Sequence, residues 1–124
     1  MEYLLLVYTD DVLHTALPQE EYASRMRGCL QHADELRTEG KLKDFRQLED
    51  KTTAKSVRIR NGKTTVLDGP FAETKEVLAG FNLIEADSLE EAVEIATHIP
   101  WAQTGCIEVR PVRDSDKVRR AVGA

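Results

Sequence analysis

The stretch around which the rest of the chain is arranged is Val66-Leu67-Asp68-Gly69-Pro70-Phe71-Ala72-Glu73-Thr74-Lys75-Glu76. Its first residues are typical of the end of a β-strand. Gly69-Pro70 then predicts a bend, because proline fixes its own φ and disfavours helical backbone at the residue before it. The bend sets Asp68 on one side and a polar run on the other, behind the ring of Phe71. Polar groups gathered in this way are a candidate ligand site.

Strands are predicted on both sides of this bend. Before it, residues 56–68 form a β-hairpin, because Asn61-Gly62 favours a turn with positive φ at both central positions. That turn sets Val57 opposite Val66 across the hairpin. After the bend, Leu78–Ala86 is apolar at nearly every position, which is typical of a strand buried on both faces.

Two amphipathic helices are predicted outside these strands. Thr9–Leu17 is interpreted as a connecting loop, and Pro18 as the first residue of a helix that ends at Gly40. Ser88 and Glu91 have the spacing of a capping box, in which each side chain accepts from the other residue's backbone N–H. The second helix follows this box.

Three further strands complete the predicted domain, at Tyr3–Tyr8, Leu42–Leu48 and Cys106–Val112. The order of elements predicts an α+β fold, a ferredoxin-like βαββαβ sandwich with an inserted β-hairpin and both helices on one face of the sheet. We expect one domain over residues 1–112. The tail, residues 113–124, is either frayed or a short helix.

The composition excludes several classes of partner. The 124 residues carry a net charge of −5, and the 17 Lys and Arg are dispersed, whereas nucleic-acid binding needs a concentrated positive face. No apolar run reaches the ~18 residues that a membrane span requires. The chain enters its first strand without a basic leader, and its two cysteines have no Cys-x-x-Cys spacing, so we expect a cytoplasmic, reducing location.

The first strand provides an argument for a homodimer. Tyr3–Tyr8 is apolar on both faces, but a chain of this length has helices to cover only one. The other face would remain an exposed apolar patch, and such patches indicate association. Two-fold packing of two sheets would cover it.

The bend and its surroundings resemble a known family. Asp68–Glu76, followed by Gly80-Phe81 and Ile84-Glu85, is similar to the signature of the DGPF family, a branch of the YCII-related proteins. The opening strand Tyr3–Tyr8 and the ending Gly105–Val112 resemble the same family. The resemblance implies a dimeric α+β barrel.

The same resemblance implies less about activity. Family members are mostly uncharacterised; some accompany extracytoplasmic-function sigma factors, which implies a sigma-factor partner, and one relative is a dehydrochlorinase acting on an aromatic substrate. A histidine on the first helix, paired with an aspartate, is the proposed catalytic pair of the wider group. That position falls on Cys29 here, and the nearest imidazole is His32.

Candidate catalytic residues are Asp68, as acceptor or base, and His32, whose ordinary pKa of ~6.5 suits a general base. Either the bend is a ligand site, or it is a structural corner in which Phe71 plugs the core and Asp68 caps backbone N–H groups. His32 is either a base or a half-exposed residue at the helix edge. The predicted ligand-binding residues at the bend are Phe71, Glu73, Thr74 and Lys75.

A second candidate group lies on the last strand. Glu108 and Arg110 alternate with apolar residues and are predicted to face the dimer cleft together with Asn82. They either bind a polar ligand or form a mutual salt bridge. His14 and His98 carry no pattern and are predicted at the surface.

No cofactor or metal is predicted. The sequence contains no glycine-rich phosphate loop or metalloprotease helix, and Cys29 with His32 supplies too few ligands for zinc. Three classes of function remain: a small-molecule enzyme, a ligand-sensing or sigma-factor-binding module, and an interaction protein without a ligand.

Overall fold

The computed structural model describes residues 1–71 and 74–124. In chain order the elements are β1 (Glu2–Asp10), α1 (Asp11–Thr15), α2 (Gln19–Thr38), β2 (Leu42–Gln47), the 3₁₀ helix η1 (Lys51–Thr53), β3 (Lys55–Arg60), β4 (Lys63–Asp68), β5 (Glu76–Glu85), α3 (Leu89–Thr97), the 3₁₀ helix η2 (Pro100–Gln103), β6 (Gly105–Pro111) and α4 (Ser115–Val122).

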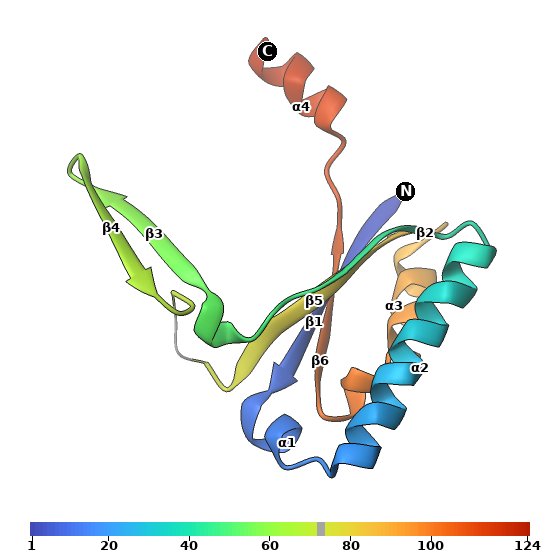
Figure 1. The fold of residues 1–124 in the computed structure, drawn as a ribbon. Coiled ribbons are helices and arrows are strands. Elements are labelled where there is room, and N and C mark those ends of the chain that lie inside the picture. Colours follow the sequence, from blue (N-terminus) through green and yellow to red (C-terminus); the bar gives the residue numbers. More distant parts are fainter. Residues whose placement is uncertain (72–73) are drawn as a thin grey trace.

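The main sheet has the order β2-β5-β1-β6, with every neighbouring pair antiparallel. Both α2 and α3 lie on one face of it (Figure 1). Without the hairpin strands β3 and β4, the order along the chain is β1, α2, β2, β5, α3 and β6. This is the ferredoxin-like βαββαβ arrangement, and the predicted α+β fold is confirmed. None of the described helices is long and apolar enough to cross a membrane.

The inserted hairpin β3–β4 forms its own two-stranded sheet and extends away from the helices (Figure 1). Asn61 and Gly62 have φ values of 53° and 75°, as the turn requires. The predicted pairing of Val57 with Val66 is confirmed. Local turn chemistry therefore determined this register, even though both valines remain exposed.

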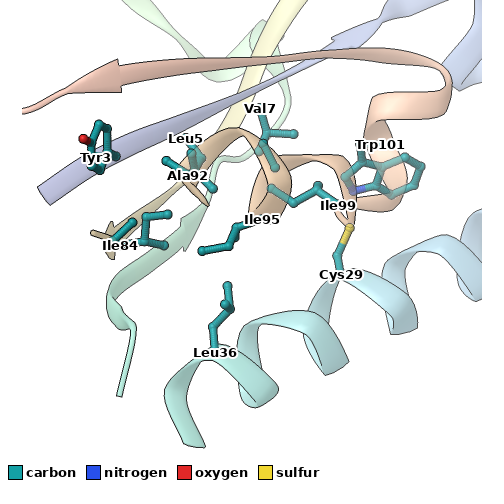
Figure 2. Close-up of a cluster of buried hydrophobic side chains, with 12 residues drawn as sticks. Tyr3, Leu5, Val7, Cys29, Leu36, Ile84, Ala92, Ile95, Ile99 and Trp101 are labelled. Carbon is teal, nitrogen blue, oxygen red and sulfur yellow. The ribbon is translucent and has the colours of Figure 1, made fainter. Parts of the chain in front are cut away.

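The core lies between the sheet and the two helices. Alternate residues of β1 are buried, and Leu5 and Ile84 are fully buried. Figure 2 shows these side chains meeting Ile95 of α3 and Leu36 of α2. The opposite face of the sheet, called the open face here, carries side chains that are only partly buried: Leu4, Leu6, Tyr8, Phe81 and Leu83.

The prediction of a loop over residues 9–17 was wrong. β1 continues to Asp10, whose carboxylate accepts a hydrogen bond from the Leu13 N–H at 3.0 Å and caps the short helix α1. At the N-cap of α3, Ser88 accepts from the Glu91 N–H at 3.1 Å as predicted. The predicted reciprocal bond to the Glu91 side chain was wrong, because the Glu91 carboxylate turns to Lys41, with its oxygen 3.8 Å from Nζ. The tail forms a helix, α4.

Candidate functional site

A pocket of about 400 Å³ lies between α2 and the helix-covered face of the sheet, at the end near α1. We call it the helix-side pocket. Six of its lining residues carry the polar groups and rings considered below, and they come from β1, α1, α2, β2, β5 and η2: Thr9, His14, Tyr22, Phe45, Asn82 and Trp101. Six elements converge here, so the pocket is a product of the tertiary fold.

Two residues with polar side chains lie largely buried in the wall of this pocket. Asn82 is 4% exposed and Thr9 is 8% exposed. Neither the Asn82 amide nor the Thr9 hydroxyl hydrogen-bonds to any described residue. Both residues line the pocket, so their polar groups are open to it. These two groups are therefore available to a bound molecule.

The prediction that Asn82 faces the dimer cleft was wrong. Asn82 pairs with Leu5 of β1 and is two residues from Ile84, so it shares their helix-covered face. The segment Leu78–Ala86 is apolar on both faces, so its own pattern gives no indication of which face is inside. The pairing with β1 determines which residues of β5 face the helices.

Three aromatic rings lie together at one end of the pocket. The ring centroid of His14 is 5.4 Å from that of Tyr22 and 4.9 Å from that of Trp101, both edge-on. His14 Nδ1 is buried and has no hydrogen-bond partner in the described chain. The prediction of a surface position for His14 was wrong, because the helix α1, capped by Asp10, turns this ring inward.

The bend forms a second, more open pocket of about 780 Å³, lined by Asp68, Phe71, Thr74 and Lys75 among others. The Asp68 carboxylate is 85% exposed and pairs with Lys55 of the neighbouring strand. Phe71 is 76% exposed, so it does not plug the core, and the alternative of a filled structural corner was wrong. Glu73 lies outside the described residues.

Two of the polar residues after the bend make local hydrogen bonds. The Thr74 hydroxyl donates to the Glu76 carbonyl at 2.5 Å, and the Lys75 carbonyl accepts from the Asp11 N–H at 3.2 Å. The bend is thus tied to the start of α1 through its backbone. A ligand-binding role for Asp68, Phe71, Thr74 and Lys75 stays a prediction.

His32 does not lie near Asp68. It lines a groove between α2 and α3, whereas Asp68 ends the hairpin on the far side of the molecule from those helices (Figure 1). The ring of His32 is 6.1 Å from that of His98, and His32 Nδ1 is buried without a described partner. Burial lowers the pKa of His32, and the charge of His98 adds to this effect. The structure therefore does not bring the two predicted catalytic residues together.

The lowered pKa predicts a stability that depends on pH. The unfolded chain, with the ordinary value of 6.5, takes up a proton at higher pH than the folded chain. The contribution of His32 is therefore complete above pH ~6.5 and declines as the pH falls below it. Between pH 7.5 and 5.5, urea unfolding of His32→Gln should show a smaller loss of stability than the wild type. Equal losses would contradict this assignment.

Glu108 and Arg110 lie on the open face. Arg110 Nη1 is 3.6 Å from Glu108 Oε2, which is the mutual salt bridge that the sequence left as one alternative. The Tyr8 hydroxyl also donates to Glu108, at 3.3 Å. Among the described residues, no cluster of three or more His, Cys, Asp or Glu is arranged to hold a metal.

Comparison with known proteins agrees with the fold and the motif. The model of the YCII-related domain matches residues 1–116. The chain belongs to the YCII-related family. A relative, "Uncharacterized protein R00369" of Rhizobium meliloti (strain 1021), is 40% identical over 114 residues, covering 90% of this chain and 92% of the relative. This relative is uncharacterised, so the similarity indicates no activity for the chain.

In this YCII-related protein, the position that the resemblance assigns to a catalytic histidine is Cys29, which lines the helix-side pocket. Figure 2 shows its sulfur pointing from α2 toward Ile99 and Trp101. Burial raises the pKa of the Cys29 thiol to about 11. It therefore stays protonated at neutral pH and does not provide a thiolate nucleophile. The imidazole that lines this pocket is His14, which comes from α1.

Proposed function

We propose that this YCII-related protein binds a small molecule in the helix-side pocket, in contact with Asn82, Thr9 and His14. The observation that carries the proposal is that the Asn82 and Thr9 side chains line the pocket without a hydrogen-bond partner in the described chain, and that His14 Nδ1 is buried beside them, also without one. An unsatisfied buried polar group costs ~1–3 kcal/mol. Residues retained at such a cost are typical of binding sites, where function is favoured over stability.

The helix-side pocket is better supported than the bend as the binding site. At the bend, Asp68 is exposed and already paired with Lys55. An exposed charge such as Asp68 would contribute little free energy to ligand binding, since solvent competes for both charges of any ion pair it forms. The helix-side pocket instead combines rings with a few buried polar groups, which is the usual composition of a ligand site.

The test uses the chain's single tryptophan, Trp101, which lines the pocket and so reports on it by fluorescence. Small metabolites are screened by thermal shift, and hits are titrated against the wild type and Asn82→Leu. We expect Asn82→Leu to weaken binding at least ~10-fold while its melting temperature stays equal or rises, because the amide has no hydrogen bond in the described chain to lose and the leucine adds apolar surface.

Asp68→Asn is the matched control at the bend, and we expect it to bind as the wild type does. If binding were lost in Asp68→Asn and kept in Asn82→Leu, the ligand would bind at the bend and not in the helix-side pocket. Equal affinity in all three proteins would contradict both locations.

We also propose that the open face forms a homodimer interface. Its apolar side chains are only partly covered within one chain, and adjacent strands contribute Leu6 and Phe81 as direct neighbours. Sedimentation velocity at micromolar concentration should show a dimer for the wild type and a monomer for Leu6→Lys, since the lysine charge would be buried without a partner. A folded wild-type monomer would contradict this proposal.

A further inference from the structure

The interior of the helix-side pocket carries no fixed charge among the residues that the structure describes. Its deep polar groups are the Asn82 amide, the Thr9 hydroxyl and the His14 imidazole, and Cys29 is held as the neutral thiol. The charged residues of the lining, Arg46 and Glu49, are exposed. The Arg46 guanidinium is also occupied, with Asp44 Oδ1 at 2.5 Å and the Phe45 carbonyl at 2.7 Å.

This distribution of charge selects against an ionised ligand. A carboxylate or phosphate transferred from water to the pocket interior would lose its hydration without gaining a counter-charge from a fixed cation. The part of a ligand that reaches Asn82 is therefore neutral, and any charged substituent would remain at the mouth, near Arg46 and Glu49.

The rings of the pocket select for a flat molecule. The centroids of His14, Tyr22 and Trp101 lie 4.9–5.6 Å apart, and Phe45 lines the pocket from β2, beside Asn82 in the sheet. Aromatic walls favour aromatic guests through edge-to-face and offset contacts, each contributing ~0.5–1.5 kcal/mol beyond the buried area. A saturated ring of similar size would bury comparable area without these contacts.

The Asn82 side chain adds a requirement of its own. Its carbonyl accepts and its NH₂ donates in one plane, so it is satisfied by a ligand edge with a donor beside an acceptor. Carboxamides and lactams have such an edge. The Thr9 hydroxyl, which both donates and accepts, adapts to either group.

We infer that the ligand of the helix-side pocket is a neutral, planar ring compound whose amide-type edge pairs with Asn82. The inference rests on the proposed function and specifies the chemical class of its ligand. It requires that planarity, neutrality and the amide edge each contribute to affinity, and each can be removed separately from a small probe.

Three probes separate these properties: benzamide, benzoate and cyclohexanecarboxamide. Each is titrated to millimolar concentration at pH 7.5 against the full chain, with Trp101 fluorescence and thermal shift as readouts. We expect benzamide to bind at least ~10-fold more tightly than either of the others. Benzamide should bind at least ~10-fold more weakly to Asn82→Asp, a substitution of the same size that replaces the donor by a charged acceptor.

The results distinguish failure of the ligand class from failure of the site. Benzoate or cyclohexanecarboxamide binding as tightly as benzamide, or no binding of any of the three, would overturn the inference about the ligand. If other compounds from the screen still bound in an Asn82-dependent way, the proposed function would stand. If no compound bound in that way, the proposed function would fail as well.

Discussion

Gly105→Ala is expected to lower the free energy of unfolding by ~3 kcal/mol or more. Gly105 begins β6 and pairs with Thr9 of β1. A Cβ atom there would overlap the Tyr8 carbonyl oxygen and lie 3.0 Å from the Tyr8 carbonyl carbon. These are backbone atoms of the neighbouring strand β1, so no rotamer change relieves the overlap. The substitution would separate β6 from β1 beside Thr9, where the helix-side pocket begins.

Gly28→Ala is the matched control. A Cβ on Gly28 would lie 3.0 Å from Pro100 Cγ, which belongs to a ring that can change its pucker. The helix α2 would also gain ~1 kcal/mol from replacing glycine by alanine in its interior. We expect Gly28→Ala to remain within ~1 kcal/mol of the wild type in urea unfolding followed by circular dichroism. If the two variants were equally stable, the close approach of β6 to β1 would be incorrect.

The elements that the sequence predicted well are those determined by neighbouring residues. The Asn61-Gly62 turn specifies its hairpin register, and Ser88 caps α3, because these interactions span only a few positions. The alternation of helices and strands was sufficient for the ferredoxin-like fold, since few arrangements satisfy it. The short helix α1 was missed because five residues are too few to show a helical period.

The helix-side pocket could not be predicted in the same way. Thr9, Asn82 and Trp101 are far apart in sequence, and they meet only after β5 has paired with β1 and η2 has packed on the sheet. The sequence instead directed attention to the bend, where polar residues are consecutive. Consecutive residues are easy to recognise, but at the bend Asp68 and Phe71 are largely exposed. A signal for His14 was nevertheless present, because an aspartate at position 10 is a favourable N-cap.

The strand β5 also shows why a segment that is apolar on both faces needs the partner strand for its interpretation. Ile84 and Leu83 are adjacent, similar in size and equally suited to a buried strand by composition. In the structure Ile84 is 0% exposed and packs in the core, whereas Leu83 lies on the open face. Substituting each by alanine therefore distinguishes the two faces.

Ile84→Ala is expected to lower the free energy of unfolding by ~3 kcal/mol, by the same amount at every protein concentration. Its side chain is enclosed by the sheet and helices of its own chain, so the cavity forms whether or not a second chain is present. Leu83→Ala should cost less than ~1 kcal/mol within one chain, but it should weaken the proposed dimer, so its effect should grow with protein concentration. Urea unfolding of the two variants at about 1 and about 50 µM, chosen to bracket dimer association, measures both losses of stability. If Leu83→Ala were the more damaging substitution at the lower concentration, the assignment of the two faces of β5 would be reversed, and Asn82 would no longer lie in the helix-side pocket.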